Sequence, residues 1–281
     1  MAIPKRKVLI TGCSDGGIGS ALALAFHKAG YHVYATARDP AKMTELKSQG
    51  IETLTLDTLS GESIAECVKK VPSLDILVNN AGRTFLMPIV DMDIAEAKKV
   101  YDINVWSHIA VTQAFMPRLL ESKGMIVNQT SIGACGTLPF QAVYNSSKAA
   151  LSMMSDTLRL ELEPFGVKVI ELRTGVVKTN LIRTMQTSTS TTLPKDSIYD
   201  PARERVEQSL RQEQFVDGGM PSQQWAEAIV RDLSKKSPQS LIWRGQAAFI
   251  FWFLSLLPHG WSDGLLKKVS GFSDVAQILR Q

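Results

Sequence analysis

Tyr144 and Lys148, separated by three residues, give the clearest chemical signal in the sequence. Residues four apart on a helix share one face, so the phenol and the ammonium are expected to point the same way. A free tyrosine, with a pKa of about 10, exchanges protons poorly at neutral pH, and a neighbouring ammonium lowers that pKa by stabilising the phenolate. The pair could therefore protonate the alkoxide that forms when a hydride is added to a carbonyl.

A glycine-rich turn, residues 12–19, follows a predicted strand and precedes a predicted helix. Glycines let the backbone approach a phosphate, and a helix N-terminus offers free N–H groups, although such a turn can also form without a ligand. The next predicted strand ends at Arg38 and has no carboxylate at Thr36 or Ala37. A carboxylate there reads the ribose of NADH, whereas an arginine meets the 2′-phosphate of NADPH. We therefore favour NADPH; a solvated Arg38 is the alternative.

Short apolar segments alternate with longer segments of helical periodicity, which is typical of βαβ units. The pattern predicts an α/β fold with a single doubly wound parallel sheet of Rossmann type and helices on both faces. The predicted strands are residues 8–11, 32–37, 52–56, 75–78, 125–128, 167–172 and 240–243. The predicted helices are residues 18–29, 40–49, 61–70, 94–120, 143–165, 202–214 and 222–235.

The strands and helices are expected to form one dinucleotide-binding and catalytic domain over residues 1–243. A lid region is expected at about residues 180–220, because the polar stretch 184–201 is too long for a simple connection. Residues 244–281 differ in composition and are expected to form an aromatic-rich C-terminal extension.

The motifs on these elements together resemble the short-chain dehydrogenase/reductase family. The turn from Thr11 is similar to the family's TGxxxGxG, with one residue more than the usual spacing. Residues 79–82 read NNAG after the fourth strand, and 12 residues separate Ser131 from the Tyr144 of YxxxK, the common family spacing. YxxxK alone would mean little, but the agreement of independent motifs over residues 7–180 is specific.

The resemblance implies an oxidoreductase with NADPH/NADP+ as cofactor and no metal. Ser131 would hydrogen-bond the substrate oxygen, Lys148 would hold the nicotinamide ribose, and Asn104 would position a water in the proton relay. The implied catalytic residues are Asn104, Ser131, Tyr144 and Lys148. The implied cofactor-binding residues are Gly12, Ser14, Gly17, Ile18, Gly19, Arg38, Asp57, Asn80, Ala81, Gly82, Tyr144, Lys148, Val177 and Thr179. Thr174 stands where the family usually has proline, in the loop that would bring Val177 and Thr179 to the cofactor.

Within the family, the chain is similar to the fungal NADPH-dependent 1-acyldihydroxyacetone-phosphate reductases, through its glycine turn, Thr174 and the segment after Trp243. This implies hydride transfer to the ketone of a lipid-like substrate such as 1-acyl-dihydroxyacetone phosphate, with Tyr144 as proton donor. A phosphate would need cations near the lid, and the candidates are Lys178, Arg183 and Lys195, which could equally be solvated. The alternatives are a ketoreductase or dehydrogenase of fungal secondary metabolism, acting on a polyketide, terpenoid or steroid-like ketone, and a non-redox binding or scaffold protein.

The apolar run 247–257 is shorter than the stretch of about 20 residues that spans a bilayer. With Trp261 and the lysines at 267 and 268 behind it, the run fits a segment in a membrane interface. A buried C-terminal helix or a subunit contact in a homo-oligomer fits as well. Location in the cytoplasm is expected, with peripheral attachment to the endoplasmic reticulum or lipid droplets as the membrane variant.

Composition excludes several other classes of protein. The chain has 281 residues, a net charge of +4 and 44% hydrophobic residues, so it is neither disordered nor a typical nucleic-acid binder. Its three cysteines, Cys13, Cys67 and Cys135, have no metal-type spacing and cannot pair completely. We therefore expect neither a disulfide-stapled secreted domain nor a nucleic-acid partner, and we read no signal peptide.

Overall fold

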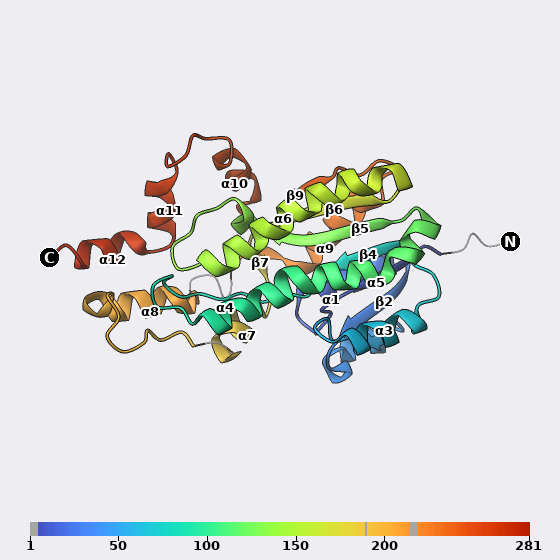
Figure 1. Ribbon diagram of the computed structural model, residues 1–281, viewed down its shortest axis with the longest axis horizontal. Helices are drawn as coiled ribbons and strands as arrows, with labels where there is room; N and C mark the ends of the chain where they lie inside the picture. The colour runs from blue at the N-terminus through green and yellow to red at the C-terminus, as the bar shows by residue number, and fades with distance from the viewer. Residues whose placement is uncertain (1–4, 189, 214–217) are drawn as a thin grey trace.

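The computed structural model describes residues 5–188, 190–213 and 218–281, and its centre is a parallel sheet in the order β3-β2-β1-β4-β5-β6-β9 (Figure 1). The chain order reverses between β1 and β4, which makes the carboxyl ends of these two strands the switch point of the sheet. The doubly wound parallel sheet expected from the sequence is therefore confirmed. The strands are β1 (Lys7–Ile10), β2 (His32–Ala37), β3 (Glu52–Thr55), β4 (Ile76–Asn79), β5 (Met125–Ser131), β6 (Lys168–Thr174) and β9 (Leu241–Arg244).

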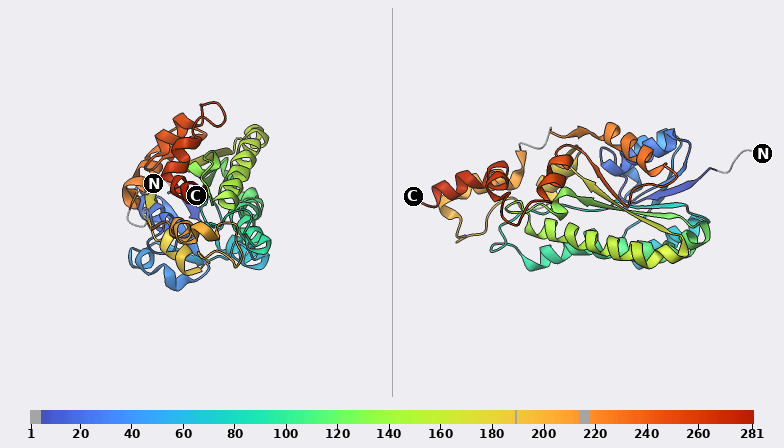
Figure 2. Two further views of the ribbon diagram at one scale, coloured as in Figure 1. Left: turned by 90° about the vertical axis from the view of Figure 1, so that its left-hand side faces the viewer. Right: turned by 90° about the horizontal axis from the view of Figure 1, so that it is seen from above.

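Helices cover both faces of the sheet, as the view from above shows (Figure 2). Side chains alternate across a strand, so Val8 and Ile10 of β1 join one apolar core and Leu9 joins the other. The first core is closed by α1 (Ile18–Lys28) and α9 (Ser222–Leu233), with Trp225 completely buried between them and the sheet. The helices of the second face are α3 (Gly61–Lys70), α4 (Ile94–Tyr101), α5 (Ser107–Ser122) and α6 (Ala142–Leu162).

The helix predicted over residues 94–120 is interrupted by a π-helical turn, η2 (Asp102–Trp106), between α4 and α5. A π-turn adds one residue to the helix, and the Ser107 hydroxyl donates to the Ile103 carbonyl beside it at 2.7 Å. One extra residue barely disturbs the apolar spacing, so the sequence pattern reads as a single helix. The turn places Asn104 at zero exposure beneath the end of β4.

The predicted helix over residues 40–49 is also divided, by Met43, into a 3-10 turn (Pro40–Lys42) and α2 (Thr44–Ser48). Pro40 favours the start of a helix, but the helical turn ends at Lys42. The side chain of Met43, between the turn and α2, is buried in the first core.

The polar stretch predicted as a loop over residues 184–201 is partly helical, because α7 spans Leu181–Ser188. Ile182 and Met185 of α7 pack into an apolar cluster with Leu193. The apolar face of α7 is difficult to recognise in the sequence because threonines and serines surround these residues. The rest of the expected lid holds α8 (Arg203–Arg211), and its end is tied to the segment before it, where β8 (Met220–Pro221) pairs with β7 (Val177–Lys178). Residues 189 and 214–217 of that region lie outside the described residues.

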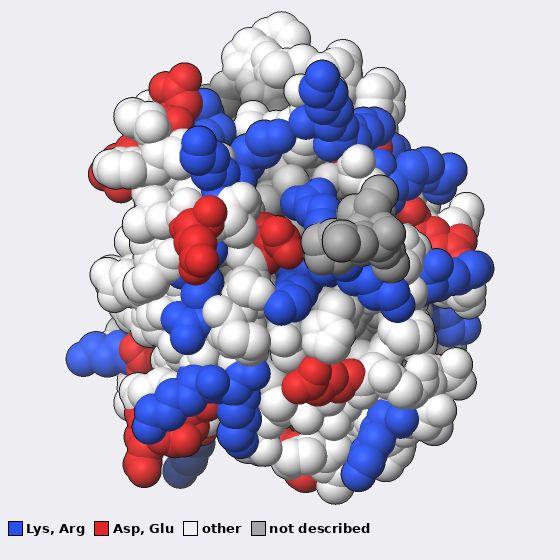
Figure 3. Space-filling view, turned by 90° about the vertical axis from the view of Figure 1, so that its right-hand side faces the viewer, with Lys and Arg blue, Asp and Glu red and all other residues white. Residues whose placement is uncertain are grey.

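The C-terminal extension folds as α10 (Ala248–Leu254), α11 (Asp263–Val269) and α12 (Phe272–Ile278), at the same end of the molecule as α7 and α8 (Figure 1). It is packed against the rest of the chain, since Val275 is fully buried and Arg205 of α8 contacts the Asp274 carboxylate at 2.8 Å. None of the helices in the described part of the chain has the length and apolar character needed to cross a bilayer. At the other end, where the N-terminus emerges, lysines and arginines are interspersed with acidic residues (Figure 3).

Candidate active site

The turn after β1 and the segment after β4 form one backbone unit at the switch point of the sheet. The Thr11 hydroxyl accepts the main-chain N–H groups of Asn80 and Ala81, both at 2.9 Å. In return, the Asn80 amide donates to the carbonyls of Thr11 and Gly12 at 2.8 and 3.1 Å. Gly12 has φ +74°, and a Cβ there would lie 2.9 Å from the Cα of Ala81. Glycine is therefore required for the two segments to approach each other.

The N-terminus of α1 is open to an anion. Its N-cap is Gly17, no side chain caps it and its first turn contains no acidic residue. Asp15 of the turn directs its carboxylate toward α2, where it accepts from the Thr44 N–H and hydroxyl at 3.0 and 2.9 Å. The one carboxylate of the turn is thus used elsewhere, and the free N–H groups of α1 fit a diphosphate. Gly12, Ser14, Gly17, Ile18 and Gly19 all belong to this unit.

Arg38 follows β2 at the same end of the sheet, and its side chain is exposed. The neighbouring Asp39 caps the 3-10 turn that follows, accepting the Ala41 N–H at 2.9 Å. Asp57, after β3, accepts the Leu59 N–H at 3.0 Å, which is the role of a turn former. The Arg38 guanidinium at the end of β2 is therefore accessible to a ligand. The Asp39 carboxylate, in contrast, is hydrogen-bonded to the main chain.

The segment after β6 lies against the glycine-rich turn. The Asn180 N–H donates to the Gly16 carbonyl at 3.1 Å, and a Cβ on Gly16 would collide with the Asn180 amide. Thr179 caps α7, accepting the Leu181 N–H at 3.3 Å. The side chain of Val177 packs against the first core, so this residue would face a ligand through its main chain. Asn180 thus joins the segment after β6 to the turn, and cofactor contacts from Val177 and Thr179 stay a prediction.

Ser131 and Tyr144 are hydrogen-bonded to each other at the end of β5 and the start of α6. Burial raises the pKa of the Tyr144 phenol, and the hydrogen bond with Ser131 offsets part of that rise. The expectation that a neighbouring ammonium brings this pKa toward neutrality is not met here, because the Lys148 Nζ donates to the Gln129 carbonyl at 2.8 Å. Tyr144 is therefore a protonated phenol at neutral pH, the form that can give up a proton.

Lys148 is only 4% exposed, and burial lowers its pKa to about 8. A Cβ on Gly82 would lie 3.6 Å from Nζ, so the absence of a side chain at Gly82 leaves space beside the ammonium. The lysine is thus charged at neutral pH and borders the unit formed by the turn and the Asn80–Gly82 segment.

The Asn104 side chain is fully engaged. Its amide donates to the Arg83 carbonyl at 2.9 Å and to the Ser147 hydroxyl at 3.0 Å, and its oxygen accepts the Arg83 N–H at 2.9 Å. The residue joins the segment after β4 to α6.

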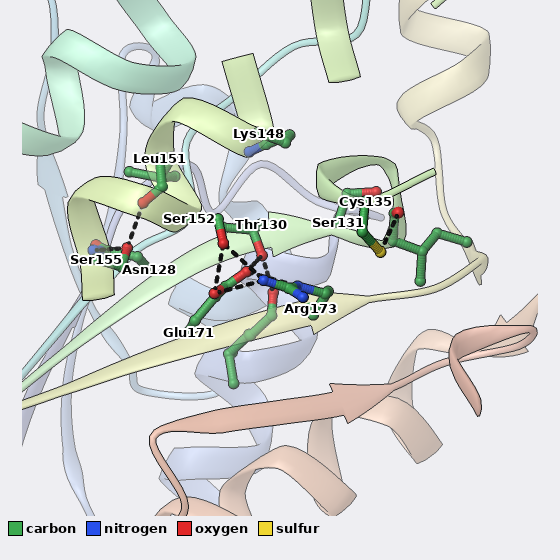
Figure 4. Close-up of polar contacts among 12 residues, drawn as sticks. Asn128, Thr130, Ser131, Cys135, Lys148, Leu151, Ser152, Ser155, Glu171 and Arg173 are labelled. Atoms are coloured by element: carbon green, nitrogen blue, oxygen red, sulfur yellow. Dashed lines mark hydrogen bonds and ion pairs between the residues drawn. The ribbon is translucent and has the colours of Figure 1, made fainter. Parts of the chain in front are cut away.

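His108, which the sequence analysis missed, lies behind Ala81. It is 2% exposed, and its Nε2 is 2.7 Å from the Ala81 carbonyl, so Nε2 carries the proton and donates. Burial and the charge of Lys148 lower its pKa to about 3. A single histidine in a helical pattern has no sequence signal that separates this role from an ordinary core position. A second unforeseen group, Glu171 and Arg173, lies behind Ser131 (Figure 4).

An apolar cluster lies at the start of α6 and includes Val143. The Phe140 ring lies 5.9 Å from that of Tyr199 and 5.6 Å from that of Phe272, in a cluster that includes side chains of the lid and the extension. Phe140 has φ +68°, an uncommon backbone conformation, and its carbonyl accepts the Met87 N–H at 2.9 Å. Within the described residues, no cluster of His, Cys, Asp and Glu could hold a metal ion.

Comparisons with known proteins agree with this geometry. Residues 6–190 match the family model described as short chain dehydrogenase. A short-chain dehydrogenase/reductase of Pestalotiopsis microspora is 54% identical over 280 residues, covering 100% of this chain and 99% of the relative. The NADPH-dependent 1-acyldihydroxyacetone phosphate reductase of Schizosaccharomyces pombe is 42% identical over 230 residues, 77% of this chain and 78% of the relative. The structure of a short-chain dehydrogenase from Streptomyces avermitilis superposes with a TM-score of 0.78 at 27% identity, over 98% of both chains.

His108→Gln tests whether a neutral imidazole supports Ala81. An unfolded histidine takes up a proton below pH 6.5, whereas His108 in the folded chain does so only near pH 3. The free energy of unfolding therefore falls as pH drops through this window, by up to about 1.4 kcal/mol per pH unit. The free energy of unfolding of the variant has no such dependence on pH. The difference in free energy of unfolding between the variant and the unaltered chain, measured with urea, should therefore become smaller as pH falls from neutral. His259→Gln, at an exposed position, serves as control, and a deficit independent of pH would contradict the assignment.

Proposed function

This chain belongs to the short-chain dehydrogenase/reductase family, and we propose that it is an NADPH-dependent reductase of a ketone on an apolar, lipid-like substrate. The observation that supports this most is the protonated Tyr144 hydrogen-bonded to Ser131, with the buried Lys148 ammonium one helical turn further on. A protonated phenol suits reduction, in which the site must supply a proton.

NADPH fits the residues present. The uncapped N-terminus of α1 would hold the diphosphate, the exposed Arg38 the 2′-phosphate, and Lys148 the hydroxyls of the nicotinamide ribose. When bound, NADPH supplies the hydride. The Schizosaccharomyces pombe relative is named as NADPH-dependent, which agrees with Arg38.

The proton path follows from the hydrogen bonds of the site. Ser131 would donate to the substrate carbonyl and Tyr144 would then pass its proton to the alkoxide oxygen. The Ser131 hydroxyl, which lowers the pKa of the Tyr144 phenol, would stabilise the phenolate that remains. Asn104 holds the segment after β4 against α6, and its part in positioning a relay water stays a prediction.

The substrate class follows from the lid. Ile182, Met185 and Leu193 turn inward, whereas Lys178, Arg183 and Lys195 lie on the exposed side. An acyl chain fits this lining, and similarity to the Schizosaccharomyces pombe reductase makes 1-acyl-dihydroxyacetone phosphate the first candidate. Because Lys178, Arg183 and Lys195 are exposed rather than part of this lining, a second candidate is a neutral polyketide, terpenoid or steroid-like ketone.

The C-terminal extension would bring the enzyme to a lipid surface. Large apolar side chains are exposed on and just after α10, with the Phe249 and Trp252 rings stacked at 5.2 Å. The exposed Lys267 and Lys268 follow on α11, which suits an anionic membrane. This apolar patch consists of Phe249, Ile250, Trp252, Phe253, Leu256 and Trp261. Peripheral attachment to the endoplasmic reticulum or lipid droplets from the cytoplasm stays a prediction.

A homo-oligomer also stays a prediction. The outer surfaces of η2, α5, α6 and the turn after α6 expose apolar side chains that a second copy would cover. They are Trp106, Leu120, Met153, Leu160 and Phe165.

Tyr144→Phe tests the proposed reaction. Loss of the hydroxyl should lower turnover by about 10²- to 10⁴-fold, because the proton donor is gone, while NADPH binding stays unchanged. Turnover is followed by NADPH absorbance with 1-acyl-dihydroxyacetone phosphate and with a neutral polycyclic ketone, and binding by NADPH fluorescence. Tyr31→Phe, which also removes a hydrogen-bonded hydroxyl, is the control. Undiminished turnover in Tyr144→Phe would refute the mechanism, and reduction of the neutral ketone alone would select the second substrate class.

Arg38→Gln tests the choice of cofactor. A charged hydrogen bond contributes about 1.5–3 kcal/mol, so the affinity for NADPH should fall about 10- to 100-fold while that for NADH is unchanged. Titration of both cofactors by fluorescence gives the two constants, with Arg231→Gln on α9 as a remote control. Equal weakening of NADPH and NADH would place Arg38 away from the 2′-phosphate.

Vesicle sedimentation tests the apolar patch. Replacing Phe249, Phe253 and Trp261 by serine should abolish binding to vesicles of anionic phospholipid without lowering the melting temperature, because all three side chains are exposed. Leu59→Ser, at an exposed apolar side chain after β3, should leave binding intact. Unchanged sedimentation of the triple variant would assign the patch to a protein contact or to none.

A further inference from the structure

A buried ion pair lies beside Ser131, in contact with the neighbouring Thr130 (Figure 4). The Glu171 carboxylate on β6 is 4% exposed and accepts from the Thr130 hydroxyl at 2.6 Å and the Ser152 hydroxyl at 2.9 Å. Arg173, two residues further along β6, donates to both carboxylate oxygens, at 2.9 and 3.0 Å, and to Ser152 at 2.7 Å. Every oxygen of the carboxylate is thus used, as a buried charge requires.

The partners of Glu171 lie beside the catalytic groups. Thr130 sits between Ser131 and Gln129, whose carbonyl holds the Lys148 Nζ at 2.8 Å. Ser152 follows Lys148 by four residues on α6, so it shares the helix face of Tyr144 and Lys148. A single carboxylate therefore connects the strand that bears the serine to the helix that bears the tyrosine and the lysine.

Arg173 extends the connection to the loop after Ser131. Its guanidinium lies over the Trp243 ring at 4.8 Å, and its positive charge lowers the pKa of the Cys135 thiol, just past the 3-10 turn η3 (Ile132–Ala134). Planar stacking together with two bonds to Glu171 leaves the guanidinium one orientation. The loop that follows the serine is thereby held from behind.

A second buried ion pair provides a comparison. Asp232 of α9 accepts two hydrogen bonds from Arg244 of β9, at 2.9 and 2.7 Å, and is also buried. It joins α9 to the edge strand on the opposite face of the sheet, and its partners are Arg244 and Lys235. Within the described part of the chain, this pair contacts no residue of the candidate active site, so it serves as an example of an ion pair that only stabilises the fold.

We propose that Glu171 and Arg173 are positioning residues, which hold Ser131 and Lys148 at the separation that proton transfer requires. The proposal rests on the reductase function proposed above. Neither side chain takes part in bond making; the pair acts through Thr130, Ser152 and the loop after Ser131.

The test compares single and double variants. Glu171→Gln and Arg173→Met each leave an unpaired buried charge and should lower the melting temperature by about 10 °C. The double variant has no unpaired charge, so it should recover most of that loss. Its kcat for the ketone that the unaltered chain reduces should nevertheless remain about 10- to 100-fold low with unchanged NADPH affinity, because the strand and helix are no longer locked together.

The double variant Asp232→Asn/Arg244→Met is the matched control. Its melting temperature should behave in the same way, and its kcat should be normal. Recovery of kcat together with stability in Glu171→Gln/Arg173→Met would overturn the proposal, because the pair would then be structural only.

Cys135 gives a readout that needs no substrate. It is the exposed one of the three cysteines, and burial raises its pKa, which Arg173 lowers and Glu171 raises. The pH dependence of its labelling by a small disulfide should shift to higher pH in Arg173→Met and to lower pH in Glu171→Gln, with Cys135→Ser as the blank. If the unaltered chain reduces no ketone, the proposed function fails, and these opposite shifts still decide whether the pair governs the loop after Ser131. Shifts in one direction, or none, would overturn that placement.

Discussion

The Thr11 hydroxyl and the two main-chain N–H groups it accepts, at 2.9 Å each, set the geometry on which the site depends. They join the carboxyl ends of β1 and β4, where the order of strands in the sheet reverses. The approach of the two segments is possible only because Gly12 has no Cβ to meet Ala81. The turn after β1 continues from this junction into the uncapped N-terminus of α1. The segment after β4 continues to Gly82, which lies next to the Lys148 ammonium.

Burial determines the protonation states of the groups in the site. It keeps the phenol of Tyr144 protonated, lowers the pKa of Lys148 to about 8 and holds His108 neutral. The same burial makes every polar group costly unless it is paired, which accounts for the chain of hydrogen bonds from Asn104 to Ser147 and from Lys148 to Gln129. The acid–base chemistry and the polar core beneath it are consequences of one dry environment.

The sequence predicted the sheet and the groups that meet at its edge because strand spacing and motif spacing are local patterns. It predicted neither the π-turn at Asn104 nor the helix Leu181–Ser188, since one inserted residue and a few apolar positions among threonines leave the periodicity almost unchanged. The buried ion pair of Glu171 and Arg173 could not be predicted from the sequence, for another reason. Their partners Thr130 and Ser152 are remote in sequence, so only the fold reveals that a charged pair in a strand is buried and bridged.

The hydrogen bond from Asn180 to the Gly16 carbonyl, at 3.1 Å, makes the phosphate-type turn and the start of the lid neighbours through the backbone itself. Any movement of α7 therefore acts on the turn, and any restraint on the turn acts on the start of α7. Occupancy of the turn and the position of α7 are linked in a single equilibrium. Because such linkage is reciprocal, a ligand that holds α7 in place would strengthen the binding of a phosphate at the turn by the same factor as the phosphate strengthens its own binding.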